Sequence, residues 1–385
     1  MEKLRPEYKR FDELRTNVKD LSEYSHLKEI ARRLLGVLDF VSVSNVSNED
    51  INRLIKYVET ILPILPQPQC DNSRFLFDAY MIAAFREMLD GISVGLSQMI
   101  LPTCEEEWSH RIVYLPSFGG AKIPRVDLIS FKGEPQLFDV VLLDYPWLYH
   151  ELGHILLYEY RESFRPTFTR VLDKVVRRLK ARSLGDSPVN KRRAEATIDK
   201  LERFWGMEDG PGSWAIEIGA DVVALWTCGP AFLTAFDKEL DNRKPDPYMI
   251  SVQHPPYEIR SIGLTHAGSR LGWSKYTTPL KDRVKLWKTP SFRKNRTNEY
   301  VSYANKEILY GAISSALEMC ANLKIPVCDQ NKVKAIGNLL QDKATIDFGA
   351  ELVIAAWLVN QELGRNEYYS WERETIEALS KKLRL

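Results

Sequence analysis

Apolar residues recur at helical spacing over most of the chain, and this pattern predicts a largely helical protein. Residues 240–297 differ from their helical neighbours in being rich in proline, which predicts loops there. The segments with helical spacing are a helix capped at Asn48–Asp50, a longer helix over about 74–101, a charged pair at about 168–182 and 190–205, an apolar helix from near Ser213 to just before Gly229, and the chain from 298 onward, including the apolar stretch 346–359.

The pattern changes between about 110 and 143, where short β-branched and aromatic runs replace the helical spacing. Residues 111–115 and 125–131 are two such runs, separated by glycine and proline, and they predict two strands. Residues 137–143 form a third candidate strand.

The length of 385 residues exceeds one ordinary core and predicts several regions. We expect an N-terminal helical region over 1–105 and a C-terminal helical region over 271–385. Between them lies a central region over 106–270, with a charged helical insertion at about 168–205. The flanking helical regions could contact a protein partner.

Charge and cysteine content narrow the class of protein. The 53 basic and 52 acidic residues give a net charge of +1, which does not favour DNA or an anionic membrane as a partner. Five cysteines without a CxxC pair are typical of reduced, buried thiols. The charged N-terminus lacks a signal core, and no apolar run reaches the length of about 18 residues that a membrane span needs. We therefore expect a cytoplasmic protein without a membrane span.

One segment carries a metal-binding pattern. Residues His150-Glu151-Leu152-Gly153-His154 read HExxH, and Pro146 favours the start of a helix just before them. Residues four apart share a helix face, so both imidazoles can reach one ion, and neutral imidazole suits Zn²⁺. Glu151 lies beside that face and can reach a water molecule at the metal. The alternative is a chance match on a buried helix.

The apolar helix after Ser213 offers a third ligand, which a catalytic zinc site needs alongside an open position. Glu217 and Asp221 are four residues apart and share a face of this helix. Buried carboxylates are costly without partners. A metal for Glu217 and a ligand imidazole for Asp221 would provide them. The alternative is two solvated acids on an amphipathic helix.

A third motif, HPPYEIR, follows at 254–260 and carries His254, Tyr257 and Arg260. Taken in order, HELGH, EIGAD at 217–221 and HPPYEIR resemble the gluzincin metallopeptidases. The closest likeness is to the group that includes the CAAX prenyl endopeptidases and the bacterial heat-shock membrane proteases. That group shows HExxH, then ExxAD, then HPP or HPS followed by Arg. The resemblance covers roughly 110–265.

The resemblance implies an α+β, mostly helical fold, in which a zincin-like core with a small sheet and the HExxH helix is flanked by helical regions. It implies Zn²⁺ held by His150, His154 and Glu217, with Glu151 as general base and Asp221 as partner of a ligand histidine. The known group is embedded in membrane, whereas this sequence shows no spanning segment.

The resemblance also implies that His254 and Arg260 line the site. His254 or Tyr257 could donate to the oxyanion that forms during peptide hydrolysis. Arg260 could instead pair with Glu217 or another site carboxylate. The expected function is zinc-dependent endopeptidase activity on a peptide or protein substrate. The strand at 125–131, if it lies at a sheet edge, could bind an extended peptide by strand addition.

Two other functions stay open. The chain could be a catalytically silent zinc-binding module with a regulatory role, although every expected catalytic residue is present. It could also be a non-peptidase metallohydrolase such as a deformylase, but ExxAD is not the third-ligand pattern expected there. The basic and aromatic segment 273–296 could bind single-stranded nucleic acid, but such a segment is more often a solvated loop with anchoring aromatics.

Overall fold

The computed structural model forms two compact units, which we call the sheet unit and the helical unit. The sheet unit comprises Met1–Ala83, Gly95–Val140 and Ala378–Leu385, and the helical unit comprises Ala84–Val94 and Val141–Glu377. The structure describes 73–92, 99–105, 109–113, 126–132, 141–183, 187–207, 213–342 and 346–383, with scattered positions between Glu13 and Glu59. Of the expected helix after Asn48, only Asn52, Ile55, Lys56 and Glu59 are described, and all four are helical. Most of the N-terminal helical region lies outside the described residues.

The sheet unit contains a three-stranded sheet of order β1-β3-β2, formed by β1 (Met99–Glu105), β2 (Ser109–Val113) and β3 (Val126–Lys132). β3 pairs in parallel with β1 and antiparallel with β2. Because β3 is the central strand, the prediction that 125–131 could accept a peptide at a sheet edge is wrong.

β2 and β3 form near the segments predicted as strands at 111–115 and 125–131. β1 was not predicted, and its first residues were expected to belong to a helix ending near 101. Of the third candidate strand, 137–140 lie outside the described residues, and Leu142–Asp144 form a 3-10 turn.

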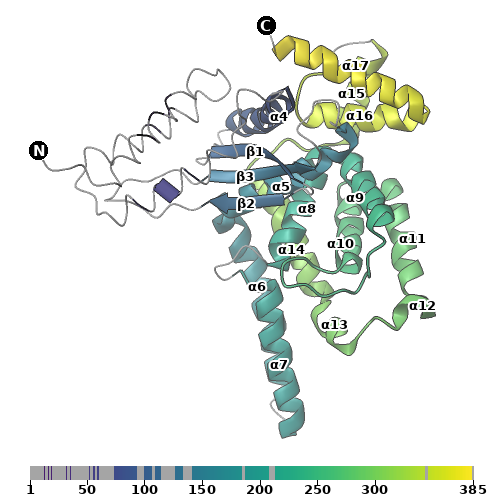
Figure 1. Cartoon of the computed structure of the whole chain (residues 1–385). Helices are drawn as coiled ribbons and strands as arrows, with labels where there is room; N and C mark the ends of the chain where they lie inside the picture. The colour runs from purple at the N-terminus through teal and green to yellow at the C-terminus, as the bar shows by residue number, and fades with distance from the viewer. Residues whose placement is uncertain are drawn as a thin grey trace, which may run out of the picture. The chain divides into compact units, whose positions relative to one another are not determined.

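The helical unit holds all three motifs, and Figure 1 shows its helices. Together with α4, which begins in the sheet unit, its elements are α4 (Ser73–Asp90), η2 (Leu142–Asp144), α5 (Pro146–Glu159), α6 (Arg161–Ser183), α7 (Pro188–Trp205), α8 (Trp214–Cys228), α9 (Pro230–Arg243), α10 (Tyr257–Arg270), η3 (Ser274–Thr277), α11 (Thr278–Trp287), α12 (Pro290–Arg293), α13 (Asn298–Tyr303), α14 (Lys306–Asn322), α15 (Gln330–Gln341), α16 (Ala350–Glu362) and α17 (Arg365–Leu383).

The core of this unit is built around α8, which is buried along almost its whole length. α5, α10 and α14 pack against α8, and α6 packs along α14. The apolar sequence of α8 is explained by this position, because a helix that is hydrophobic on all sides is stable only when surrounded. The only charged side chains on α8 are those of Glu217 and Asp221, and both are buried.

The predicted α+β, zincin-like core is wrong for the part of the chain that carries the motifs. Every described element between Val141 and Glu377 is helical, and the sheet belongs to the other unit. The strand pattern is a local signal of extended backbone and does not specify which compact unit the strands join. Within the helical unit, the HExxH helix has helices as its packing partners instead of a sheet.

The proline-rich segment 240–297 is more helical than its composition suggests. Pro279 and Pro290 stand in the first turns of α11 and α12, where a missing backbone N–H costs nothing. Trp273 and Trp287 in this segment are buried, so they act as anchors rather than as an exposed stacking surface. In the part of the chain that the structure describes, no helix has both the length and the apolar character to cross a membrane.

Candidate metal centre

α5 presents the two histidines of HExxH on one side. Pro146 occupies its first turn, as the sequence predicted. Leu148, Leu152 and Ile155 are fully buried on the core side of the helix. His150 and His154 therefore lie together on another face, with their ring centroids 4.8 Å apart.

α8 approaches α5 closely because small residues meet at the crossing. A Cβ on Gly153 would lie only 3.0 Å from the Cα of Ala220, and one on Gly219 would lie 2.8 Å from a methyl of Leu157. Real Cβ atoms do not tolerate such contacts without movement of a neighbour. The glycines inside HELGH and EIGAD thus let Glu217 reach the histidines.

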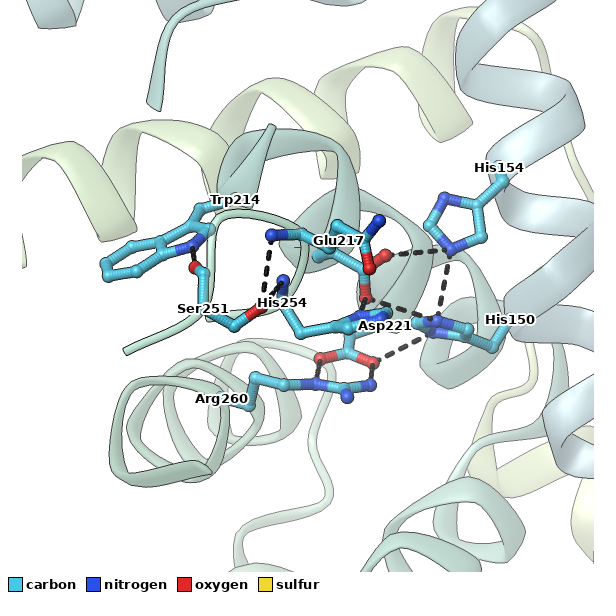
Figure 2. A network of polar contacts seen from close by, with 9 residues as sticks. His150, His154, Trp214, Glu217, Asp221, Ser251, His254 and Arg260 are labelled. Atoms are coloured by element: carbon cyan, nitrogen blue, oxygen red, sulfur yellow. Dashed lines mark hydrogen bonds and ion pairs between the residues drawn. The ribbon is translucent and has the colours of Figure 1, made fainter. Parts of the chain in front are cut away.

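Three ligand atoms converge at this crossing, as Figure 2 shows. His150 Nε2 lies 3.2 Å from His154 Nε2 and 3.6 Å from Glu217 Oε2, and His154 Nε2 lies 3.3 Å from Glu217 Oε1. Ligands about 2.0–2.2 Å from a tetrahedral zinc ion are about 3.3–3.6 Å apart, which these separations match. The three residues could hold a metal ion.

The Glu217 carboxylate has an unusual environment for a buried group. It is 5% exposed, and within the described residues its Oε2 atom accepts no hydrogen bond. Burial would raise its pKa, but the neighbouring imidazoles of His154, His150 and His254 hold the pKa well below its ordinary value. A buried carboxylate oxygen without a hydrogen bond is costly unless a cation compensates it, which fits a metal ligand.

Asp221 fixes the orientation of His150. Its Oδ1 lies 3.0 Å from His150 Nδ1, which leaves Nε2 directed towards the other ligand atoms. Burial lowers the pKa of His150, but Asp221 and Glu217 outweigh burial and raise it to about 9. Because a metal ligand must be the neutral imidazole, metal binding at neutral pH would displace this proton.

Arg260 holds Asp221 in turn. Its Nε and Nη2 donate to the two carboxylate oxygens of Asp221 at 2.9 and 2.6 Å, a bidentate pair buried on both sides. The guanidinium also lies over the rings of Phe236 and Trp147, at 5.1 and 5.7 Å. Burial alone would raise the pKa of Asp221, but Arg260 lowers it below its ordinary value. The carboxylate that Arg260 pairs with is therefore Asp221 rather than Glu217.

His254 approaches the same site from the loop between α9 and α10. Its Nδ1 lies 3.3 Å from Glu217 Oε2, while its side chain is 61% exposed. His254 thus stands between the buried carboxylate and solvent. The sequence motif placed it near the site, and the structure brings it against a candidate ligand.

Glu151 and Tyr257, the other two predicted site residues, have fewer contacts with the metal group. Glu151 is buried on α5 beside His150, and its charge contributes to the raised pKa of that histidine. Tyr257 begins α10 with its ring 6.3 Å from Phe236, and among the described residues no hydrogen bond or ion pair joins it to the metal group. Two tryptophans that contribute to the site, Trp147 and Trp214, lie outside the three sequence motifs. The signal for Trp147 was its position three residues before His150, on the same helix face.

The three motifs that suggested a metallopeptidase thus meet at one place in the helical unit, and six of their side chains form one connected network of contacts. Comparison of the chain with protein-family models, with curated proteins and with solved structures finds no match.

Proposed function

We propose that the chain is a zinc-dependent endopeptidase. The observation that carries the proposal is the convergence of His150 Nε2, His154 Nε2 and the Glu217 carboxylate: the two nitrogens lie 3.2 Å apart, and they lie 3.6 Å from Oε2 and 3.3 Å from Oε1, close to the ligand separations of a tetrahedral zinc site. Two imidazoles and one carboxylate leave a fourth position for water or substrate, as in catalytic zinc sites.

The surroundings of these three residues support a preorganised site. Asp221 Oδ1 lies 3.0 Å from His150 Nδ1, within ion-pair distance, and Arg260 fixes Asp221 by two hydrogen bonds. Such partners hold a ligand imidazole in the correct tautomer and increase its basicity. A chance cluster of ionisable groups would not explain why His150 faces the buried Asp221 and why Asp221 in turn is held by the buried Arg260.

The proposed chemistry gives each side chain of the site a role. Zinc, when bound, lowers the pKa of a coordinated water towards about 7 and polarises the scissile carbonyl. Glu151 takes a proton from the water as its oxygen bonds to the carbonyl carbon. When the carbon–nitrogen bond breaks, Glu151 passes that proton to the leaving amine, so the products are a carboxylic acid and an amine, and transfer of the acid's proton to the amine gives the carboxylate and the ammonium ion. His254, at the solvent side, can donate to the carbonyl oxygen as negative charge develops there.

The test compares Glu151→Gln with wild-type protein, both loaded with zinc, on fluorescein-labelled casein. We expect turnover to fall by roughly 10²–10⁴-fold while zinc content is unchanged, because Gln keeps the shape but cannot accept the proton. Glu195→Gln, on the exposed surface of α7, is the control and should leave turnover unchanged.

Two results would contradict the proposal. Full turnover in a metal-loaded Glu151→Gln protein would remove Glu151 as the base. A wild-type protein that binds zinc and cleaves no casein or other denatured protein would favour the silent zinc-binding module instead.

A further inference from the structure

The loop that carries His254 is tied to the start of α8. Trp214, the first residue of α8, is fully buried, and its indole Nε1 donates to the backbone oxygen of Ser251 at 2.8 Å. Figure 2 shows this hydrogen bond on the far side of His254 from the two ligand histidines. The contact joins the helix that bears Glu217 to a loop 37 residues further along the chain.

The loop itself is shaped by Ser251. Its Oγ accepts from the backbone N–H groups of Gln253 and His254, at 3.2 and 3.4 Å, which closes a tight turn. Pro255 and Pro256 follow directly and restrict the backbone before α10 begins. The position of the His254 backbone is therefore set by Ser251 on one side and by α10 on the other.

An exposed imidazole does not stay at one contact without such support. His254 is 61% exposed, yet its Nδ1 lies 3.3 Å from Glu217 Oε2. Ordering an exposed side chain and its loop costs conformational entropy, which a single contact at 3.3 Å does not offset. The hydrogen bonds at the base of the loop, of which the one from Trp214 is partly buried, provide the missing restraint.

Trp214 is itself held rigidly. Its ring stacks on Phe204 at 4.8 Å between centroids and meets Trp205 edge-on at 5.5 Å, and both rings belong to the last turn of α7. An indole packed in this way has one polar atom, the Nε1–H, and it points to Ser251. The donor is thus fixed before the loop meets it.

We propose that Trp214 is a positioning residue, whose indole N–H fixes Ser251 and thereby aims His254 at the metal site. The kinetic part of this inference rests on the proposed peptidase activity. Trp214 does not touch the reacting atoms. It acts by keeping the His254 imidazole within reach of the carbonyl oxygen of a substrate.

The kinetic test is Trp214→Phe, which keeps an aromatic ring and removes the donor. Trp226→Phe is a matched control, because Trp226 also lies on α8 and its Nε1 donates to the backbone oxygen of Ile325 at 2.8 Å, outside the loop. On labelled casein, we expect Trp214→Phe to lower kcat by about 10-fold or more, since a small misplacement of a catalytic group is costly. KM and zinc content should stay the same, and Trp226→Phe should match wild type in kcat.

A double-mutant cycle then tests the route of the effect. In a His254→Ala background, Trp214→Phe should cause no further loss of kcat, because the residue that it positions is already absent. A loss of the same size in both backgrounds would overturn the inference. Equal losses of kcat in Trp214→Phe and Trp226→Phe would also overturn it, because they would indicate general damage to the core.

A spectroscopic arm does not depend on turnover. In protein labelled with ¹⁵N-histidine, at a single pH, the His254 ring signal is identified by its loss in His254→Ala. We expect it to shift in Trp214→Phe and to stay in place in Trp226→Phe. If wild type cleaves no casein, the proposed function fails, while this signal still decides the role of Trp214.

A second variant covers failure of Trp214→Phe to fold. Ser251→Ala removes the Oγ acceptor of the same turn and leaves the aromatic core intact. We expect it to shift the His254 signal in the same way. An unshifted His254 signal in the folded variants would refute the proposed positioning.

Discussion

Replacing Asp221 by alanine tests how the metal ligand His150 is supported. The substitution removes the partner of His150 Nδ1 and breaks both hydrogen bonds from Arg260. Asp221 is 1% exposed and Arg260 is 6% exposed, so the guanidinium would be left buried without its counterion. We expect two separate losses, one in metal affinity and one in stability.

The magnitudes follow from these contacts. Loss of the residue that orients a ligand histidine typically weakens metal binding by about 10–100-fold, which corresponds to about 1.4–2.7 kcal/mol. Breaking a buried ion pair by removing one member costs about 3–5 kcal/mol of folding free energy. The first is measured by competition for zinc with a chromophoric chelator, and the second by urea unfolding of metal-free protein.

A matched control lies on α9. Asp237 also pairs with an arginine, Arg283, at 2.5 Å, but its side chain is 24% exposed and Arg283 keeps Asp241 as a second partner at 2.8 Å. Asp237→Ala should therefore cost about 0.2–1 kcal/mol and leave zinc affinity unchanged. A folded Asp221→Ala protein with wild-type zinc affinity would refute the role given to Asp221.

The double variant Asp221→Ala/Arg260→Leu separates the two losses. Removing the unpaired guanidinium should restore much of the folding free energy, because an apolar pair of similar volume is tolerated where a lone charge is not. Zinc affinity should stay low, since His150 still lacks its partner. Recovery of zinc affinity in this variant would mean that the buried charge, and not the lost contact, weakened the metal site.

Two further predictions concern the frame of the site. Gly153→Ala should lower the free energy of unfolding by about 1–3 kcal/mol, because its Cβ would meet the Ala220 backbone at 3.0 Å; Gly337→Ala, with no atom within 4 Å of the new Cβ, should instead raise it by about 0.5–1 kcal/mol. Both are measured by chemical denaturation, and equal effects would contradict the close crossing of α5 and α8. Burial raises the pKa of Glu372, whose Oε1 accepts from Leu142 N–H at 2.7 Å. A carboxyl with a raised pKa binds its proton more tightly in the folded protein, so its contribution to stability is full below the unfolded pKa of about 4.3 and is lost as pH rises through the folded pKa. Glu372→Gln should accordingly have a higher Tm than wild type at pH 7, with a difference that shrinks towards pH 4, and an unchanged difference across that range would refute the assignment.

Much of the metal site could be predicted from residue spacing in the sequence alone. Residues four apart on a helix share a face, so the sequence was enough to pair His150 with His154 and Glu217 with Asp221. The helix boundaries at Pro146 and Ser213 also followed from capping chemistry, and α5 and α8 begin at or next to those residues. These predictions depend only on local backbone geometry.

Contacts between segments far apart in the sequence were harder to predict. The sequence left open whether Arg260 pairs with Glu217 or with another carboxylate, because the choice depends on how α10 lies against α8. The hydrogen bond from Trp214 to Ser251 had no sequence signal, since a tryptophan at a helix start is usually explained by packing.

The predicted fold class was wrong because local sequence patterns do not determine how distant elements pack. Short apolar runs do not distinguish strands from buried helices, and Met99–Glu105 contains Pro102, which is uncommon in strands. β1 is an edge strand of the sheet, where proline is tolerated. Nor does a local pattern show that the sheet and the HExxH helix belong to different compact units.

The proposed chemistry depends above all on His150, His154 and Glu217 holding one zinc ion together, and zinc uptake by chelator-treated protein decides whether they do. Elemental analysis after dialysis against zinc should find one zinc per chain in wild type. It should find little in His154→Ala or Glu217→Ala. His266→Ala, whose ring stacks on Tyr310 away from this group, should bind zinc like wild type. A folded wild-type protein that takes up no zinc, or uptake that survives both ligand substitutions, would contradict the proposed metal centre.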